Sequence, residues 1–267
     1  MHKLKTLFRR ILNYFLDDEL FIKKSKIGSL YKLKLYDDLT LFASQSEFNS
    51  DLNVIKEIFF KRRYSVCFPF NEIAAIIDIG GHKGYFSIFA HRNCHKESKI
   101  FYLEPIIENY VIAEKNFSLN MCKNIQMVQL AIFEKSQQGT IFFDNMQSSG
   151  HSMFTQKNRG KQKLDEREIS LISLEDFFLK YDIKHCDFLK MDCEGAEYSS
   201  LFNTKNEIFD KIDTISIEFH DISEKDYSGL KLAEFLNKRG YYIVKFDYDS
   251  TKMDRNFGRL IVTKKFH

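Results

Sequence analysis

Short, largely apolar runs recur along the chain after residue 72. Seven of them cover residues 73–77, 100–103, 125–132, 188–191, 214–219, 241–246 and 260–263. A short hydrophobic run that does not alternate with polar residues is typical of a strand buried on both faces. We therefore expect seven strands of this kind.

Most of these runs are separated by stretches in which apolar residues recur at helical spacing. The helical stretches cover residues 84–92, 106–120, 196–210 and 226–239. Strands that alternate with helices indicate a mostly parallel sheet with helices packed on its faces. Ligands of such sheets bind beyond the carboxyl ends of the strands, so the residues that end each strand are the first candidates for a site.

The first part of the chain has a different pattern. Residues 20–44 alternate in the manner of strands. Residues 29–36 and 39–42, on either side of a turn at Asp37 and Asp38, predict a hairpin, and residues 46–63 have helical spacing. We therefore divide the chain into an N-terminal helix and hairpin extension, residues 1–70, and a larger domain, residues 71–267.

An amphipathic helix is predicted at the start of the chain. Its apolar residues recur at helical spacing, and Lys3, Lys5, Arg9 and Arg10 lie beside them. The helix either packs on the protein or on a partner chain, including a second copy in a homodimer, or lies on a membrane surface as a peripheral anchor. No run of about 18 apolar residues is present, so we expect no membrane span.

The net charge and the cysteines indicate which partners and which compartment to expect. The net charge of +3 over 267 residues is close to balance, which speaks against a nucleic-acid partner. The five cysteines are scattered and none has C-x-x-C spacing. We expect reduced, mostly buried thiols in a cytoplasmic protein.

The first strand of the larger domain ends in a glycine-rich turn. Gly80, Gly81 and Gly84 permit a tight turn and close approach of the backbone to a ligand, and a helix follows. A purely structural turn is the alternative. The dinucleotide fingerprint G-x-G-x-x-G does not fit, because His82 stands at its second glycine, and a nicotinamide dehydrogenase is therefore disfavoured.

An acidic residue follows this turn at the spacing of a nucleotide-binding unit. Glu104, which ends the second strand and precedes Pro105, lies 20 residues after Gly84. A carboxylate at this offset accepts hydrogen bonds from both ribose hydroxyls and disfavours a 2′-phosphate. Together with Asp78 and Gly80, the turn resembles the first motif of S-adenosylmethionine-dependent methyltransferases, in which the acidic residue helps to hold the methionine end of the cofactor.

Two longer segments resemble the FkbM family of methyltransferases. Residues 77–87, I-D-I-G-G-H-K-G-Y-F-S, are similar to the family signature D-x-G-A-N-x-G-x-F/Y-S, and residues 187–197, D-F-L-K-M-D-C-E-G-A-E, to D-x-L-K-I-D-V-E-G-A-E. Residues 173–177 and 217–220 match further family segments in the same order. The departures are Gly81 for the usual alanine and His82 for the usual asparagine.

The resemblance covers roughly residues 46–265. It implies a Rossmann-like class I methyltransferase domain whose seven-stranded sheet is mostly parallel with an antiparallel last strand. It also implies S-adenosylmethionine as cofactor and O-methylation, often of sugars. By this likeness Asp78, the turn from Gly80 to Gly84 with Gly81 and His82, and Glu104 with Pro105 contact the cofactor, and Ala131 borders its adenine.

The next strand ends carry candidates for the chemistry. A hydroxyl acceptor needs a general base or a metal that lowers its pKa. Asp192 ends one strand, while Glu218 and His220 project to the same face of the next. These three residues form either a site for a divalent ion (Fe, Mn or Mg), a metal-free site with His220 as base, or a structural hydrogen-bond cluster.

The helix after Asp192 begins with two further carboxylates. The helix dipole favours an acidic side chain in a first turn, and that explanation suffices for Glu197. Glu194, two residues after Asp192, is close enough to reach the site.

Residues 144–170 form a polar insertion that is either a solvated loop or a substrate lid. If it is a lid, His151, Lys157 and Arg159 contact phosphate. We therefore predict a nucleotide-activated sugar as acceptor, for surface glycan synthesis. The alternatives are a lipid-linked or peptidic acceptor, and a non-catalytic cofactor-binding protein used for assembly.

Overall fold

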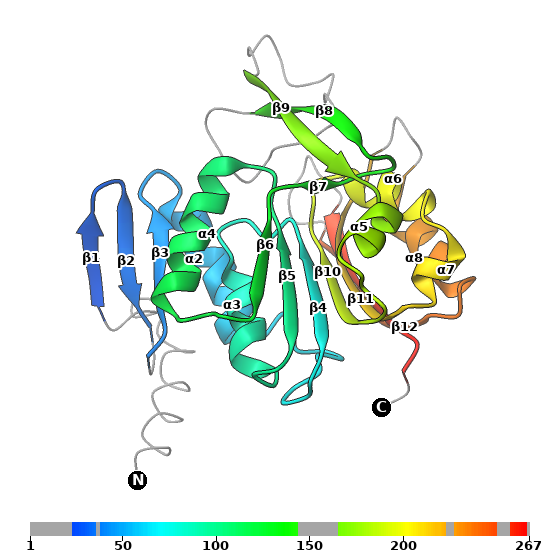
Figure 1. Cartoon of the computed structure of the whole chain (residues 1–267), viewed down its shortest axis with the longest axis horizontal. Coiled ribbons are helices and arrows are strands. Elements are labelled where there is room, and N and C mark those ends of the chain that lie inside the picture. The colour runs from blue at the N-terminus through cyan, green and yellow to red at the C-terminus, as the bar shows by residue number, and fades with distance from the viewer. Residues whose placement is uncertain (1–22, 36–37, 144–164, 223–226, 250–256, 266–267) are drawn as a thin grey trace.

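The computed structural model describes residues 23–35, 38–143, 165–222, 227–249 and 257–265. A seven-stranded sheet forms its centre (Figure 1), with the strand order β12-β13-β11-β10-β4-β5-β6. The strands are β4 (Ala75–Ile79), β5 (Lys99–Leu103), β6 (Ile125–Val128), β10 (Cys186–Met191), β11 (Ile212–His220), β12 (Tyr242–Asp249) and β13 (Phe257–Thr263).

Only β13 runs antiparallel to its neighbours, β11 and β12. The other pairs, β4 with β5 and β10, β5 with β6, and β10 with β11, are parallel. The predicted fold, a mostly parallel seven-stranded sheet with an antiparallel last strand, is confirmed.

Helices cover both faces of the sheet because each central strand is apolar on both sides. They are α3 (Tyr85–Asn93), α4 (Ile107–Leu119), α5 (Leu174–Lys180), α6 (Ala196–Phe202), α7 (Asn206–Phe209) and α8 (Gly229–Asn237). Ile77 belongs to the core under α5 to α8, whereas its neighbour Ile76 belongs to the core under α3 and α4. The prediction of a single helix over residues 196–210 was wrong, because the helix is interrupted between α6 and α7.

A second sheet lies beyond the carboxyl ends of the central strands (Figure 1). It contains β7 (Ala131–Ile132), β8 (Gln137–Phe143) and β9 (Asp165–Ile172), in the order β7-β9-β8. The run predicted as one strand over 125–132 is therefore divided between two sheets. The end of the predicted polar loop, from residue 165 onward, is a strand, while residues 144–164 lie outside the described part of the chain.

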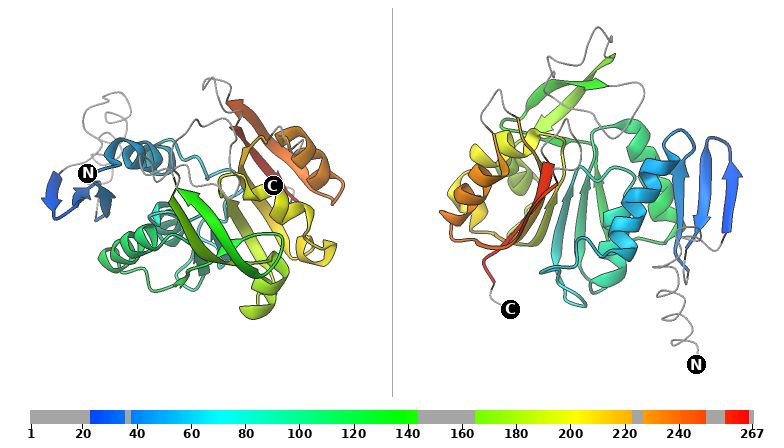
Figure 2. Two further views of the ribbon diagram at one scale, coloured as in Figure 1. Left: turned by 90° about the horizontal axis from the view of Figure 1, so that it is seen from above. Right: turned by 180° about the vertical axis from the view of Figure 1, so that it is seen from behind.

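The N-terminal extension forms a third sheet, whose last strand packs against α4 (Figure 1). β1 (Lys23–Ile27), β2 (Leu30–Lys34) and β3 (Thr40–Ser44) make an antiparallel meander, followed by α2 (Phe48–Ile55) and a π-helical turn, η1 (Lys56–Phe60). The predicted hairpin corresponds to β2 and β3. Figure 2 shows α2 between this sheet and the central domain.

The extension and the larger domain share a hydrophobic core. Leu41 and Ile58 from the extension pack in the same buried cluster as Phe89 and Phe188. The division at residue 70 stays a prediction. The predicted first helix lies outside the described residues, and in the described part of the chain no helix is long and apolar enough to cross a membrane.

All five cysteines are free thiols. The expectation that most of them are buried was wrong. Cys186 is buried, whereas the other four are partly exposed.

Candidate active site

A cavity of about 370 Å³ lies at the carboxyl ends of β4, β5, β10 and β11. Its walls come from the glycine-rich turn, from the strand ends, from the second sheet and from the N-terminal extension. The residues that line it include Arg63, Tyr64, Gly80, Gly81, His82, Glu104, Pro105, Ala131, Lys190, Asp192, Glu194, Glu218 and His220.

The turn between β4 and α3, residues 80–84, requires its glycines. Gly80 has a φ of +68°, and a Cβ there would lie 1.8 Å from the backbone oxygen of Asp192. His82 has a φ of +49°. Asparagine and histidine are both enriched in this left-handed region, which gives a physical reason for histidine at a position where the family signature has asparagine.

The other departure from the signature also has a local cause. A Cβ on Gly81 would lie 2.3 Å from the ring of Tyr102. The Tyr102 hydroxyl donates to the backbone oxygen of His82 and fixes the ring in that place. Glycine at position 81 therefore accommodates the buried Tyr102.

Asp78 does not line the cavity. It is fully buried under the turn, where it accepts a hydrogen bond of 2.7 Å from the hydroxyl of Ser87 and pairs with the Lys190 ammonium at 3.1 Å. The Lys190 ammonium donates in turn to the backbone oxygen of Gly80 at 2.7 Å. Burial lowers the pKa of Lys190, but Asp78 and Asp192 outweigh it and raise that pKa above the usual value, so the lysine is charged.

Glu104 is buried beside the turn, where it accepts two backbone hydrogen bonds. The amides of His82 and Ile106 donate to its two oxygens, each at 2.9 Å. Burial raises the pKa of Glu104 to about 7, although both hydrogen bonds lower it. Pro105 and Ala131 line the same end of the cavity, whereas Gly84 is not a lining residue.

At the other end of the cavity, His220 lies among carboxylates. Its Nε2 atom is 3.6 Å from Glu194 Oε2 and its Nδ1 atom is 3.4 Å from Glu197 Oε1. The donor atoms of Asp192, Glu197 and His220 lie within 4.8 Å of one another. Glu197 is fully buried, and the amides of Cys193 and Gly195 donate to its oxygens at 2.9 and 2.8 Å.

These carboxylates control the charge of the imidazole. Burial by itself lowers the pKa of His220, but Glu194 and Glu197 raise it well above the usual value. Burial raises the pKa of Glu194 to about 7, against the opposing effect of His220. Near neutral pH the imidazole is therefore protonated, and Glu194 titrates.

Glu218 faces the N-terminal extension. Its Oε2 atom is 2.5 Å from Nη2 of Arg63, whose guanidinium also contacts Glu57. Burial and Asp192 raise the pKa of Glu218, whereas Arg63 lowers it. Asp192, Glu218 and His220 all line one cavity, but it is Glu197 that completes the closest set of donor atoms around His220.

Four lining or neighbouring residues were not predicted from the sequence to belong to the site, namely Arg63, Tyr64, Lys190 and Glu197. Glu197 had one signal, its place two residues after Gly195 in a turn that leaves backbone amides free at a helix start. Arg63 and Tyr64 had none, because Arg63 is placed by its contact with Glu218 of β11 and Tyr64 by its packing on Phe86 of α3. The proposed phosphate contacts His151, Lys157 and Arg159 lie outside the described residues.

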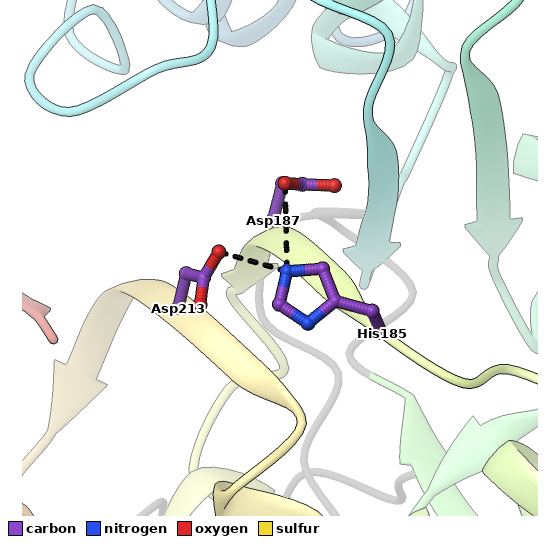
Figure 3. A group of neighbouring side chains, drawn as sticks. All are labelled: His185, Asp187 and Asp213. Atoms are coloured by element: carbon purple, nitrogen blue, oxygen red, sulfur yellow. Dashed lines mark hydrogen bonds and ion pairs between the residues drawn. The ribbon is translucent and has the colours of Figure 1, made fainter. Parts of the chain in front are cut away.

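A second histidine with two carboxylates lies outside the cavity (Figure 3). His185 Nε2 is 2.8 Å from Asp213 Oδ2 and 3.5 Å from Asp187 Oδ1, at the amino ends of β10 and β11. The Lys265 ammonium pairs with the same Asp213 oxygen at 2.7 Å. The lysine thus already supplies a cation to this cluster. Its ion pair joins β11 to the segment that follows β13.

Comparison with known proteins identifies the family. The Methyltransferase FkbM domain matches residues 78–243. "Methyltransferase 1" of Beauveria bassiana is 24% identical over 227 residues, covering 79% of this chain and 89% of the relative, and "Methyltransferase sdnD" of Sordaria araneosa is 26% identical over 194 residues, covering 62% and 73%.

Among solved structures, M. jannaschii TYW2 in complex with AdoMet aligns with a TM-score of 0.45 at 13% identity, covering 90% of this chain and 89% of that one. The strand order given above establishes the fold. The domain match, which spans more than half of the chain, establishes the family. The chain belongs to the FkbM family of S-adenosylmethionine-dependent methyltransferases.

Proposed function

We propose that the protein transfers the methyl group of S-adenosylmethionine to a hydroxyl of a sugar, in particular of a nucleotide-activated sugar used for surface glycan synthesis in the cytoplasm. The observation that carries the proposal is the His220 cluster with Asp192, Glu194 and Glu197 at the far end of the cavity from Glu104. Carboxylates and imidazole are the groups that orient and deprotonate a hydroxyl.

The cavity fits the cofactor by two features. Gly80 and Gly81 line the cavity and hold the turn tight, because the space that a Cβ would need at each is filled by Asp192 and Tyr102. Glu104 is placed to accept hydrogen bonds from ribose hydroxyls, since a carboxylate has room for about four donors and its backbone partners use two. We assign Gly80, Gly81, His82, Glu104, Pro105 and Ala131 to direct contact, and Asp78 and Gly84 to support of the turn.

When bound, the cofactor supplies the methyl group as an electrophile. The acceptor hydroxyl would have to lose its proton to a side chain of this site, and the groups placed for that are His220 and Glu194. His220 has to lose its own proton before it can accept another. Its raised pKa keeps that proton on the imidazole, so Glu194, 3.6 Å away with a pKa of about 7, is the group of this pair suited to accept the hydroxyl proton.

A divalent ion at this place is the second form of the proposal. Asp192, His220 and a carboxylate from Glu197 or Glu218 would hold it, and an ion there lowers the pKa of a coordinated hydroxyl. The fit is supported by His220 Nδ1, which is buried and makes no hydrogen bond of good geometry. Oxygen and imidazole donors of this kind suit iron, manganese or magnesium.

The proposed activity is tested by assaying the purified protein with labelled S-adenosylmethionine against a panel of nucleotide sugars. We expect label in at least one nucleotide sugar at a rate about tenfold or more above a nucleotide-only control, and S-adenosylhomocysteine in equal amount. Label only in lipid-linked sugars or peptides would replace the proposed acceptor. Cofactor binding without turnover on any of them would support an assembly role.

Cofactor affinity is expected to depend on pH through Glu104. The ionised carboxylate accepts hydrogen bonds from the ribose hydroxyls more strongly than the protonated group does, and burial raises the pKa of Glu104 to about 7. Affinity is therefore full above pH 8 and falls as the pH drops through 7 to 6. Calorimetric titration of S-adenosylhomocysteine at each pH measures this, and Glu104→Gln should weaken binding about tenfold at pH 8 while flattening the profile. An unchanged profile in that variant would assign the pH dependence to another group.

A further inference from the structure

One lysine of the cofactor turn points away from the cavity. Lys83, between His82 and Gly84, is 1% exposed and is not a lining residue. Its ammonium donates to Glu47 Oε2 at 2.7 Å and to the two Asp51 oxygens at 2.8 and 2.9 Å. A buried ammonium requires such partners, and here both come from the N-terminal extension.

Asp51 links this ion pair to two elements of the extension. It lies in α2, is fully buried, and accepts a hydrogen bond of 2.7 Å from the amide of Ser44 at the end of β3. The position of Lys83 therefore depends on both α2 and β3. The ammonium and the carboxylate are excluded from water together, so separating them would leave Asp51 without a cation and Lys83 with Glu47 alone.

Neutral hydrogen bonds join the same segments. The Asn116 side chain of α4 donates to the backbone oxygen of Lys83 at 2.9 Å and accepts from the amide of Phe42 at 2.6 Å. The hydroxyl of Tyr85, at the start of α3, donates to the backbone oxygen of Phe42 at 2.9 Å. The turn is thus fixed to β3 by Asn116 and Tyr85, while the Lys190 ammonium donates to the backbone oxygen of Gly80.

We propose that Lys83 is a positioning residue that couples the N-terminal extension to cofactor binding. Through Asp51 and Glu47 it holds the turn in the shape that receives S-adenosylmethionine. Coupling is reciprocal, so the bound cofactor also stabilises the extension. The extension is then a working part of the cofactor site, although β3 contributes no residue to the cavity.

The first test measures cofactor affinity in a double-mutant cycle. Lys83→Met keeps most of the side-chain length and removes the charge, and Asp51→Asn removes the partner charge. We expect each change to weaken binding of S-adenosylhomocysteine about tenfold by calorimetry. We expect the double variant to lose clearly less than the product of the two, because the pair acts as a unit.

A matched control separates positioning from loss of stability. Tyr241 is buried, and its hydroxyl donates to the backbone oxygens of Phe209 and Ile212 far from the turn. Tyr241→Phe removes those bonds and should lower the melting temperature while leaving cofactor affinity within about twofold. Lys83→Met with unchanged affinity and a lowered melting temperature would overturn the proposal.

Hydrogen exchange of the native protein tests the coupling without any substitution. The amides of β3, residues 40–44, do not line the cavity. Adding S-adenosylhomocysteine should slow their exchange about fivefold or more, and this gain should disappear in Lys83→Met. No change in the exchange of β3 on cofactor binding would refute the coupling, even if Lys83→Met failed to fold.

Discussion

Replacing His220 by alanine is expected to lower kcat by about a hundredfold to ten-thousandfold, the range that a positioned acid–base group contributes. The imidazole lies between Glu194 and Glu197 at the end of the cavity where we place the acceptor. The cofactor residues lie at the other end, so the dissociation constant of S-adenosylhomocysteine should stay within about threefold. Initial rates at saturating acceptor and calorimetry measure the two quantities.

His185 provides a matched control for this substitution. It too is an imidazole beside two carboxylates, Asp187 and Asp213, but it is more exposed and lies at the opposite end of the same two strands, outside the cavity. His185→Ala should keep at least half of the wild-type rate. A His220→Ala protein that retained more than a tenth of the rate would contradict the proposed role of His220.

Treatment with a chelator distinguishes catalysis with a divalent ion from metal-free proton transfer. Loss of activity that is restored by one divalent ion would assign Asp192 and His220 as ligands. Full activity of the stripped protein would exclude a required ion and leave proton transfer to the His220 and Glu194 pair.

Replacing Gly80 by alanine is expected to weaken cofactor binding by about a hundredfold or more, equivalent to about 2.8 kcal/mol. The new Cβ would lie 1.8 Å from the backbone oxygen and 2.9 Å from the backbone carbon of Asp192, and β10 cannot yield without shifting that residue. The φ of +68° adds strain for any residue with a Cβ. Calorimetry and thermal unfolding measure both consequences, and activity should fall together with affinity.

Gly240 provides a control that separates the steric clash with Asp192 from the strain of a positive φ. It has a φ of +83°, and a Cβ there would meet nothing within 4 Å. Gly240→Ala should therefore show the conformational cost alone, about 1–2 kcal/mol of stability, with unchanged cofactor affinity. Equal losses of affinity in the two variants would mean that the contact with Asp192 is not the cause.

The part of the fold that could be predicted is the part with a strong local pattern. The central strands are apolar on both faces, and their turns contain glycine, so element type and order followed from the sequence. β1 lies in the segment 20–44 with strand-like alternation but was not predicted as a separate strand, because its sequence, K-K-S-K-I, is dominated by lysines that protect an edge strand and hide its periodicity. The break between α6 and α7 carries neither glycine nor proline.

The site was predictable to the level of strand ends. Asp192, Glu218 and His220 follow or end neighbouring strands, and the carboxyl ends of parallel strands meet at one edge of the sheet. The partners of each side chain were not predictable at this level. Glu197 was assigned to the helix dipole alone, yet it accepts two backbone amides and contacts the imidazole.

The sequence by itself determined the alternation of strands and helices in the central sheet, the glycine turn and the identity of the residues at the strand ends, because these depend on burial pattern and on backbone conformation over a few residues. Only the tertiary structure decided which charges pair. Glu218 lies against Arg63, His220 lies between Glu194 and Glu197, and Lys83 is buried on Asp51. Pairing of buried charges depends on distance in space and on exclusion of water, and neither is encoded in the local pattern.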